Sequence, residues 1–150
     1  MSDLQALYQE LLLDHYRKPR NFGALALPTG RAEGHNPLCG DRVVVEVSVA
    51  DERLVDVAFR GSGCAISTAA ASLMSEATKG RPLAEVRELA ERFRGALTSE
   101  PAGAGETLGK LDALLGVRAY PMRVKCATLA WHALESAIAK GERGGLVSTE

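Results

Sequence analysis

Hydrophobic residues near the N-terminus recur every three or four positions, which is the spacing of one face of an α-helix. Ser2 precedes this stripe and is a suitable N-cap, and Pro19 follows it at a position that ends a helix. The pattern therefore predicts a first helix that closes before Pro19. Its apolar stripe consists of Leu4, Leu7, Tyr8, Leu11 and Leu12.

The next part of the chain changes to the two-residue period of β-strands. Residues 21–39 are rich in Gly, Pro and Asn, which favours extended chain and turns, with a short edge strand near Gly30 to His35. Valines then alternate with other residues up to Asp51-Glu52, and a second alternating run follows. This arrangement predicts an antiparallel hairpin whose inward positions are Val43, Val45, Val47 and Val49, then Val55, Val57 and Phe59.

The C-terminal half predicts helices. An Ala-rich segment from Cys64 to Lys79 has apolar residues at intervals of three and four, and Gly80 ends it. Pro82 opens another helix through about Phe93, with Leu83, Val86, Leu89 and Ala90 on its apolar face. We expect the remaining segments to be a loop over Thr98 to Gly105, a short helix near Thr107 to Leu115, a helix from about Val124 to Lys140, and a flexible tail over 142–150.

Length and composition narrow the class of protein. A chain of 150 residues with 46% hydrophobic content fits one domain, residues 1–150. Eighteen Lys and Arg nearly balance nineteen Asp and Glu, so no basic field favours nucleic acid. The chain has no apolar run of about eighteen residues and no signal-peptide pattern, so we expect a cytoplasmic protein with no membrane partner. Three cysteines, an odd number, argue against a disulfide framework.

A thiol and a carboxylate lie two residues apart on a turn, Cys39-Gly40-Asp41. Residue 51 lies midway between residues 42 and 60, so the hairpin places Asp41 and Gly61 at the same end of its strands. Cys64 therefore returns close to Cys39. Within the intervening Gly61-Ser62-Gly63, the glycines remove side chains where backbone must approach a partner closely.

Cys39, Asp41 and Cys64 resemble three ligands of a tetrahedral metal site. Cys126, the remaining cysteine, lies on the inward stripe of the final helix and is the candidate fourth ligand. Thiolates with one carboxylate suit zinc best, and ferrous iron and iron-sulfur clusters are the rivals for the same donors. The alternative is that each cysteine only fills space in the core, which is how Cys126 would be interpreted by itself.

Four ordered motifs resemble the SufU/IscU family of iron-sulfur cluster assembly proteins, which includes the N-terminal domain of NifU-type scaffolds. The resemblance implies an α+β fold of the SufE/NifU type, a single-domain two-layer sandwich in which a small antiparallel sheet packs against helices. It also implies a cysteine desulfurase as partner and apo iron-sulfur proteins or cluster carriers downstream. The motifs are residues 14–23 (DHYRKPRNFG), 36–41 (NPLCGD), 61–67 (GSGCAIS) and 124–129 (VKCATL).

The resemblance is stronger to the SufU branch. IscU-type members usually have a histidine immediately before the third cysteine, where this chain has Lys125. The segment Thr98 to Val117 also resembles an insertion typical of SufU-type members. SufU-type proteins resemble zinc-dependent sulfur acceptors, which implies a sulfurtransferase with the zinc ligands Cys39, Asp41, Cys64 and Cys126. By the same resemblance, Cys39 is the nucleophile that receives sulfur.

Two other functions stay open from the sequence. The same cysteines would serve a scaffold on which a transient [2Fe-2S] cluster forms, or a purely structural zinc module. The three histidines are assigned no metal. His15 is expected to be solvated or at an interface, His35 is an exposed loop residue that could reach the ion or a partner, and His132 lies about 240° around the final helix from Cys126.

Overall fold

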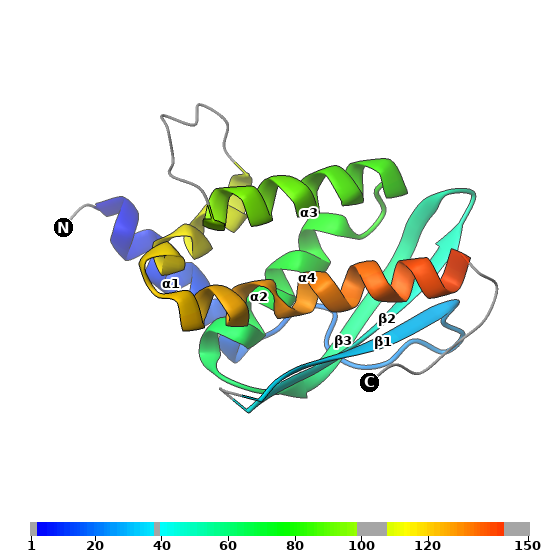
Figure 1. Ribbon diagram of the computed structural model, residues 1–150, viewed down its shortest axis with the longest axis horizontal. Helices are drawn as coiled ribbons and strands as arrows, with labels where there is room; N and C mark the ends of the chain where they lie inside the picture. Colours follow the sequence, from blue (N-terminus) through cyan, green and yellow to red (C-terminus); the bar gives the residue numbers. More distant parts are fainter. Residues whose placement is uncertain (1–2, 38–39, 99–107, 143–150) are drawn as a thin grey trace.

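The computed structural model describes residues 3–37, 40–98 and 108–142. Within these residues a three-stranded sheet and five helical segments form two layers (Figure 1). The α+β fold expected from the sequence is confirmed. In chain order the elements are α1 (Asp3–Arg17), β1 (Gly30–Asn36), β2 (Asp41–Ala50), β3 (Arg53–Ser62), α2 (Ala65–Thr78), α3 (Leu83–Thr98), the 3₁₀ segment η1 (Gly109–Ala119) and α4 (Pro121–Glu142).

The sheet is antiparallel with strand order β1-β2-β3. Asp51 and Glu52, the two turn residues of the predicted hairpin, have φ values of 53° and 58°. Two successive positive φ values belong to the tight turn whose twist matches the flanking strands. The register pairs Arg42 with Ser62 and Val43 with Gly61, so the start of β2 and the end of β3 meet as predicted.

A β-bulge in the hairpin corrects one predicted inward position. Ser48 pairs with Asp56 but Val49 pairs with Leu54, which leaves Val55 as an extra residue on β3. An extra residue reverses the inward and outward alternation beyond it. Val55, predicted to face inward, is therefore 49% exposed, and Leu54 is completely buried in its place.

The helices cover one face of the sheet, and the core lies between the two layers (Figure 1). α4 packs along β1 and β2, while α2 packs against α4, α1 and β3. The Ala-rich sequence of α2 permits this close approach because small side chains separate the helix axes least. The largest fully buried side chains include Trp131, Phe93, Leu54, Leu73 and Met74.

The ends of the helices differ from the predicted ones. α3 continues past Phe93 to Thr98, and α4 begins at Pro121 because proline suits the first position of a helix. The short helix is a 3₁₀ segment that begins at Gly109. Of the predicted loop, residues 99–105 lie outside the described residues, as does the tail beyond Glu142. None of the described helices is both long enough and apolar enough to cross a membrane.

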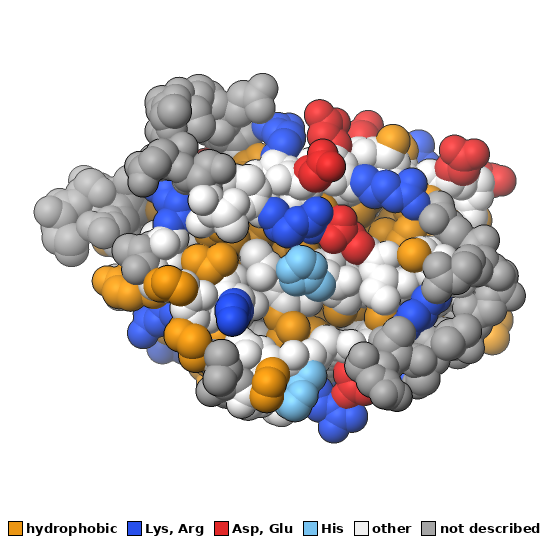
Figure 2. All heavy atoms as spheres, viewed as in Figure 1, with side chains coloured by type: hydrophobic (Ala, Val, Ile, Leu, Met, Phe, Trp, Pro, Cys, Tyr) orange, Lys and Arg blue, Asp and Glu red, His pale blue; other side chains and the backbone are white. Residues whose placement is uncertain are grey.

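Hydrophobic side chains gather on the surface at one end of the molecule, where α1 and the first turns of α4 lie (Figure 2). The exposed hydrophobic residues of these elements include Tyr16 on α1 and Met122 on α4, and Tyr120 immediately precedes α4. This end of α4 also carries Cys126.

Candidate metal centre

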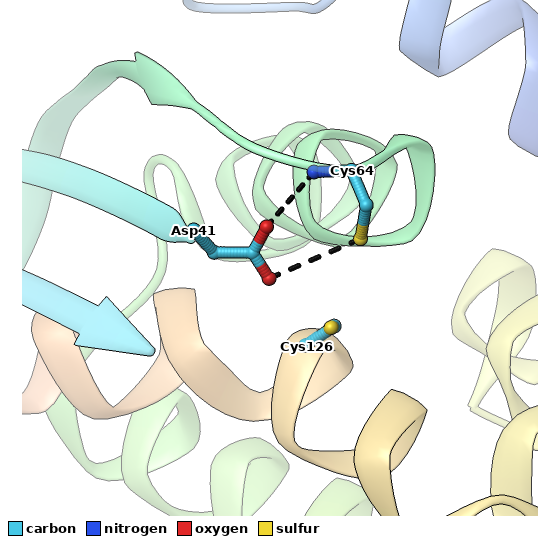
Figure 3. A group of neighbouring side chains, drawn as sticks. All are labelled: Asp41, Cys64 and Cys126. Carbon is cyan, nitrogen blue, oxygen red and sulfur yellow. Dashed lines mark hydrogen bonds between the residues drawn. The ribbon is translucent and has the colours of Figure 1, made fainter. Parts of the chain in front are cut away.

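Three potential ligands converge from three separate elements. Asp41 is the first residue of β2, Cys64 is the N-cap of α2, and Cys126 lies in the second turn of α4. One ligand atom from each, a carboxylate oxygen and two Sγ atoms, lies within 4.8 Å of the other two. Figure 3 shows the three side chains directed toward one another. Cys39, the fourth predicted ligand, lies outside the described residues.

Hydrogen bonds fix Asp41 and Cys64 relative to each other (Figure 3). The backbone N–H of Cys64 donates to Asp41 Oδ1 at 2.9 Å, and the Cys64 thiol lies 3.9 Å from Oδ2. Cys64 Sγ also accepts a hydrogen bond from the backbone N–H of Ser67 at 3.4 Å, as an N-cap side chain does. A helix N-terminus favours negative charge, which suits a thiolate at this position.

The glycines before Cys64 are required by close packing, as the sequence indicated. A Cβ on Gly61, whose φ is +153°, would lie 2.0 Å from the carbonyl oxygen of Arg42. A Cβ on Gly63 would lie 2.6 Å from Asp41 Oδ1. Gly40, on the turn before Asp41, has a φ of +74°, in the left-handed region that glycine adopts readily.

The burial of the three residues differs. Asp41 is completely buried, Cys126 is 2% exposed, and Cys64 is accessible to solvent. A buried carboxylate beside two thiols is unfavourable without a cation or sufficient hydrogen-bond donors. The group therefore has both the donor atoms and the burial of a metal site.

Two histidines lie on the surface near α4. Exposed His35 and His132 line an open hollow between the end of β1 and α4, together with Lys125. Neither histidine belongs to the group of potential ligands found among the described residues. His132 therefore stands apart from that group, as its position on the helix predicts, and Lys125 is an exposed residue of the hollow.

His15 corrects a prediction made from the sequence. The sequence predicts a solvated or interface residue, but His15 is completely buried, and its Nδ1 is hydrogen-bonded to Ser72 Oγ at 2.7 Å. Ser72 Oγ also accepts the backbone N–H of Arg20 at 2.9 Å. Burial is the main cause that lowers the pKa of His15 below its ordinary value. His15 follows Leu11 by four residues and Leu12 by three, so it continues the stripe of the first helix, and this spacing was the available signal for its burial.

Comparisons with known proteins identify the family. The family model described as the NifU-like N terminal domain matches residues 7–143. The chain belongs to this family. It is 37% identical over 143 residues to the zinc-dependent sulfurtransferase SufU of Bacillus subtilis, covering 95% of this chain and 97% of the relative.

Two further relatives agree with this assignment. The iron-sulfur cluster assembly scaffold protein IscU of Streptococcus pyogenes is 37% identical over 138 residues, covering 92% of this chain and 86% of the relative. The crystal structure of FiSufU, a candidate cluster assembly scaffold of the SUF system from Fervidobacterium islandicum, superposes with a TM-score of 0.77. It is 31% identical and the match covers 89% of this chain and 98% of FiSufU. Family and fold therefore agree with the resemblance seen in the sequence.

Proposed function

We propose that this protein receives sulfur from the persulfide of a cysteine desulfurase at a zinc site and passes it into iron-sulfur cluster assembly. The proposed ligands are Asp41, Cys64, Cys126 and Cys39. The observation that carries the proposal is the convergence of a buried carboxylate and two thiols from three elements. The similarity to a zinc-dependent sulfurtransferase supports zinc as the ion and sulfur as the cargo.

The separation of Cys64 and Asp41 is close to that of two ligands of one zinc ion. Zinc binds sulfur at about 2.3 Å and carboxylate oxygen at about 2.1 Å, so a tetrahedral site separates these two atoms by roughly 3.6 Å. Cys64 Sγ and Asp41 Oδ2 are 3.9 Å apart. Two thiolates and one carboxylate leave one tetrahedral position for the thiolate of Cys39. When bound, zinc supplies a positive charge that keeps the thiols deprotonated.

The proposed chemistry transfers one sulfur atom without net oxidation. The Cys39 thiolate attacks the terminal sulfur of the donor persulfide. The S–S bond of the donor breaks, its electron pair remains on the donor cysteine, and that cysteine leaves as a thiolate. Cys39 then carries the persulfide, while Asp41, Cys64 and Cys126 retain the site. Repeated transfer to apo iron-sulfur proteins or cluster carriers would make the protein a zinc-dependent sulfurtransferase.

Intact-protein mass spectrometry tests the acceptor directly. The zinc-loaded chain is mixed with a purified cysteine desulfurase and free cysteine, and the mass is followed with time. The wild-type chain is expected to gain the mass of one sulfur atom, and Cys39→Ala to gain none. Omission of free cysteine controls for the donor, and Leu27→Ala, at an 86% exposed position, controls for substitution in general. Sulfur uptake by Cys39→Ala at the wild-type rate would refute the assignment.

A second candidate is a scaffold on which a [2Fe-2S] cluster forms and is then transferred. The similarity to the IscU of S. pyogenes, equal in identity to that with SufU, favours it. Thiolate ligands also suit iron-sulfur clusters. The two functions differ in the ion that stays bound. Metal analysis of the purified protein, followed by anaerobic incubation with iron, sulfide and an apo acceptor, measures which ion remains and whether a cluster moves to the acceptor.

A further inference from the structure

The two carboxylate oxygens of Asp41 face different partners. Oδ1 accepts the backbone N–H of Cys64 at 2.9 Å, whereas Oδ2 lies 3.9 Å from the Cys64 thiol. The carboxylate is completely buried, so each oxygen needs a compensating partner. The amide satisfies Oδ1, but a thiol is only a weak donor to Oδ2. Oδ2 is therefore the oxygen that is available to a cation.

Gly63 allows this orientation of the carboxylate. A Cβ at position 63 would lie 2.6 Å from Asp41 Oδ1 and 3.1 Å from Asp41 Cγ. Gly63 is not among the described glycines with positive φ, so its backbone conformation does not require glycine. The three atoms nearest to such a Cβ all belong to the Asp41 side chain. Because the nearest atom is a carboxylate oxygen and no backbone atom is among the three nearest, we expect a Cβ to displace the carboxylate first.

We propose that Gly63 and the backbone amide of Cys64 are positioning groups that hold Asp41 as a one-oxygen ligand, with Oδ2 turned toward the two thiols. This inference rests on the proposed metal site. The hydrogen bond joins two proposed ligands, because the backbone amide of Cys64 fixes the carboxylate of Asp41. Groups that orient a metal ligand typically change metal affinity about 10–100-fold when they are altered.

The variant Gly63→Ala tests the positioning role without removing a donor atom. Zinc affinity is measured by chelator competition, and the ligand field by the absorption of the Co²⁺-substituted protein. We expect Gly63→Ala to bind zinc about 10–100-fold more weakly and to shift the Co²⁺ spectrum. Gly95→Ala is the matched control, because a Cβ on Gly95 meets no atom within 4 Å, and it should bind as the wild type does.

The variant Asp41→Asn separates positioning from a general disturbance of the loop before Cys64. Once the ligand oxygen is gone, adding Gly63→Ala should cause no further loss of zinc affinity. An equal loss in both backgrounds would show that Gly63→Ala acts through the backbone of Cys64, and would overturn the proposal. A wild-type affinity for Gly63→Ala alone would overturn it as well.

A measurement on the metal-free protein covers the case in which Gly63→Ala does not fold. The side-chain amide oxygen introduced by Asp41→Asn can still accept the Cys64 N–H, whereas Asp41→Ala leaves this N–H without its acceptor. Thermal unfolding should therefore give a Tm for Asp41→Asn near that of the wild type, and a Tm for Asp41→Ala lower by roughly 2–12 °C. Equal Tm values for the two variants would refute the role of the Cys64 amide.

The outcomes also distinguish this inference from the proposed function. If the wild-type chain binds no zinc, the metal site itself is refuted and the positioning role with it. If the wild-type chain binds zinc and accepts sulfur but Gly63→Ala binds zinc equally well, only the positioning role fails.

Discussion

Burial of His15 has a consequence that ordinary surface histidines do not have. Its Nδ1 is hydrogen-bonded to Ser72, and its Nε2 lies 3.8 Å from a carboxylate oxygen of Glu76. Protonation would place a charge on a ring that is removed from water. The neighbouring charges partly cancel, because Arg20 and Lys110 lower the pKa of His15 whereas Glu76 and Asp14 raise it, and desolvation is the largest cause of the net lowering.

Stability should therefore fall as the pH falls below about 6.5. The unfolded chain takes up a proton near the ordinary value of 6.5, and the folded chain does so only at lower pH. Between these two pKa values the unfolded state binds more protons, so acid favours unfolding with a slope of at most about 1.4 kcal/mol per pH unit. Above 6.5 the ring is neutral in both states and its contribution is constant.

Urea unfolding of the metal-free chain at a series of pH values measures this slope. His15→Asn is the comparison, because its amide can replace the hydrogen bond to Ser72 but does not titrate. The free energy of unfolding of this variant should change less between about pH 6.5 and about pH 5 than that of the wild type. Parallel pH profiles for the two proteins would show that His15 does not contribute to the acid sensitivity.

The bulge on β3 gives two neighbouring residues very different solvent exposure. Leu54 is completely buried and Val55 is 49% exposed. Leu54→Ala leaves a cavity in the core and should lower the free energy of unfolding by about 2–5 kcal/mol. Val55→Ala removes a half-exposed side chain and should lower it by no more than about 1 kcal/mol. Urea unfolding of the two variants checks this, and the reverse order would contradict the register of the hairpin.

The alternating valines were sufficient to predict the hairpin, because strand period and turn position depend on local sequence. The bulge at Val55 was not predicted. Leu54 and Val55 are both apolar, so the alternation does not show which of the two faces the core. The burial of His15 was missed for a different reason. Its position continues the stripe of the first helix, but histidine is polar and was not counted with the apolar residues, although its Nδ1 finds a buried partner in Ser72.

The candidate site depends on two kinds of contact. Local sequence patterns predict the first, between Asp41 and Cys64, but not the second, the approach of Cys126. The hairpin register alone brings Asp41 near Cys64, and the structure agrees with this prediction. Cys126 comes from a helix more than sixty residues later, and its approach depends on how α4 packs on the sheet and on α2. The inward stripe of the final helix made Cys126 a candidate, but no local pattern encodes that packing, so only the family resemblance joined it to the other ligands.

The position of the site relative to the core determines what zinc removal should do. The core is built from large buried side chains such as Trp131, Phe93 and Leu73, and of the three potential ligands only Cys126 is buried among its hydrophobic residues. The metal-free chain should therefore remain folded. A ligand that binds only the folded state stabilises it by about 2.7 kcal/mol at a free concentration about 100 times its Kd. For a chain of this size, that corresponds to a Tm higher by roughly 5–11 °C.

Thermal unfolding with excess zinc and with a chelator measures this difference, and circular dichroism at room temperature shows whether the chelated chain keeps its helices. Cys64→Ser should reduce the dependence of Tm on zinc, because it removes one thiolate, while the core remains unchanged. Loss of helical signal on chelation would instead indicate a structural zinc module, in which metal binding supplies the folding free energy. A Tm that does not depend on zinc would contradict the metal site itself. If the metal-free chain stays folded and its Tm depends on zinc, the fold does not require every ligand to remain on the ion. Cys39 can then leave the ion to accept sulfur, as the proposed transfer requires.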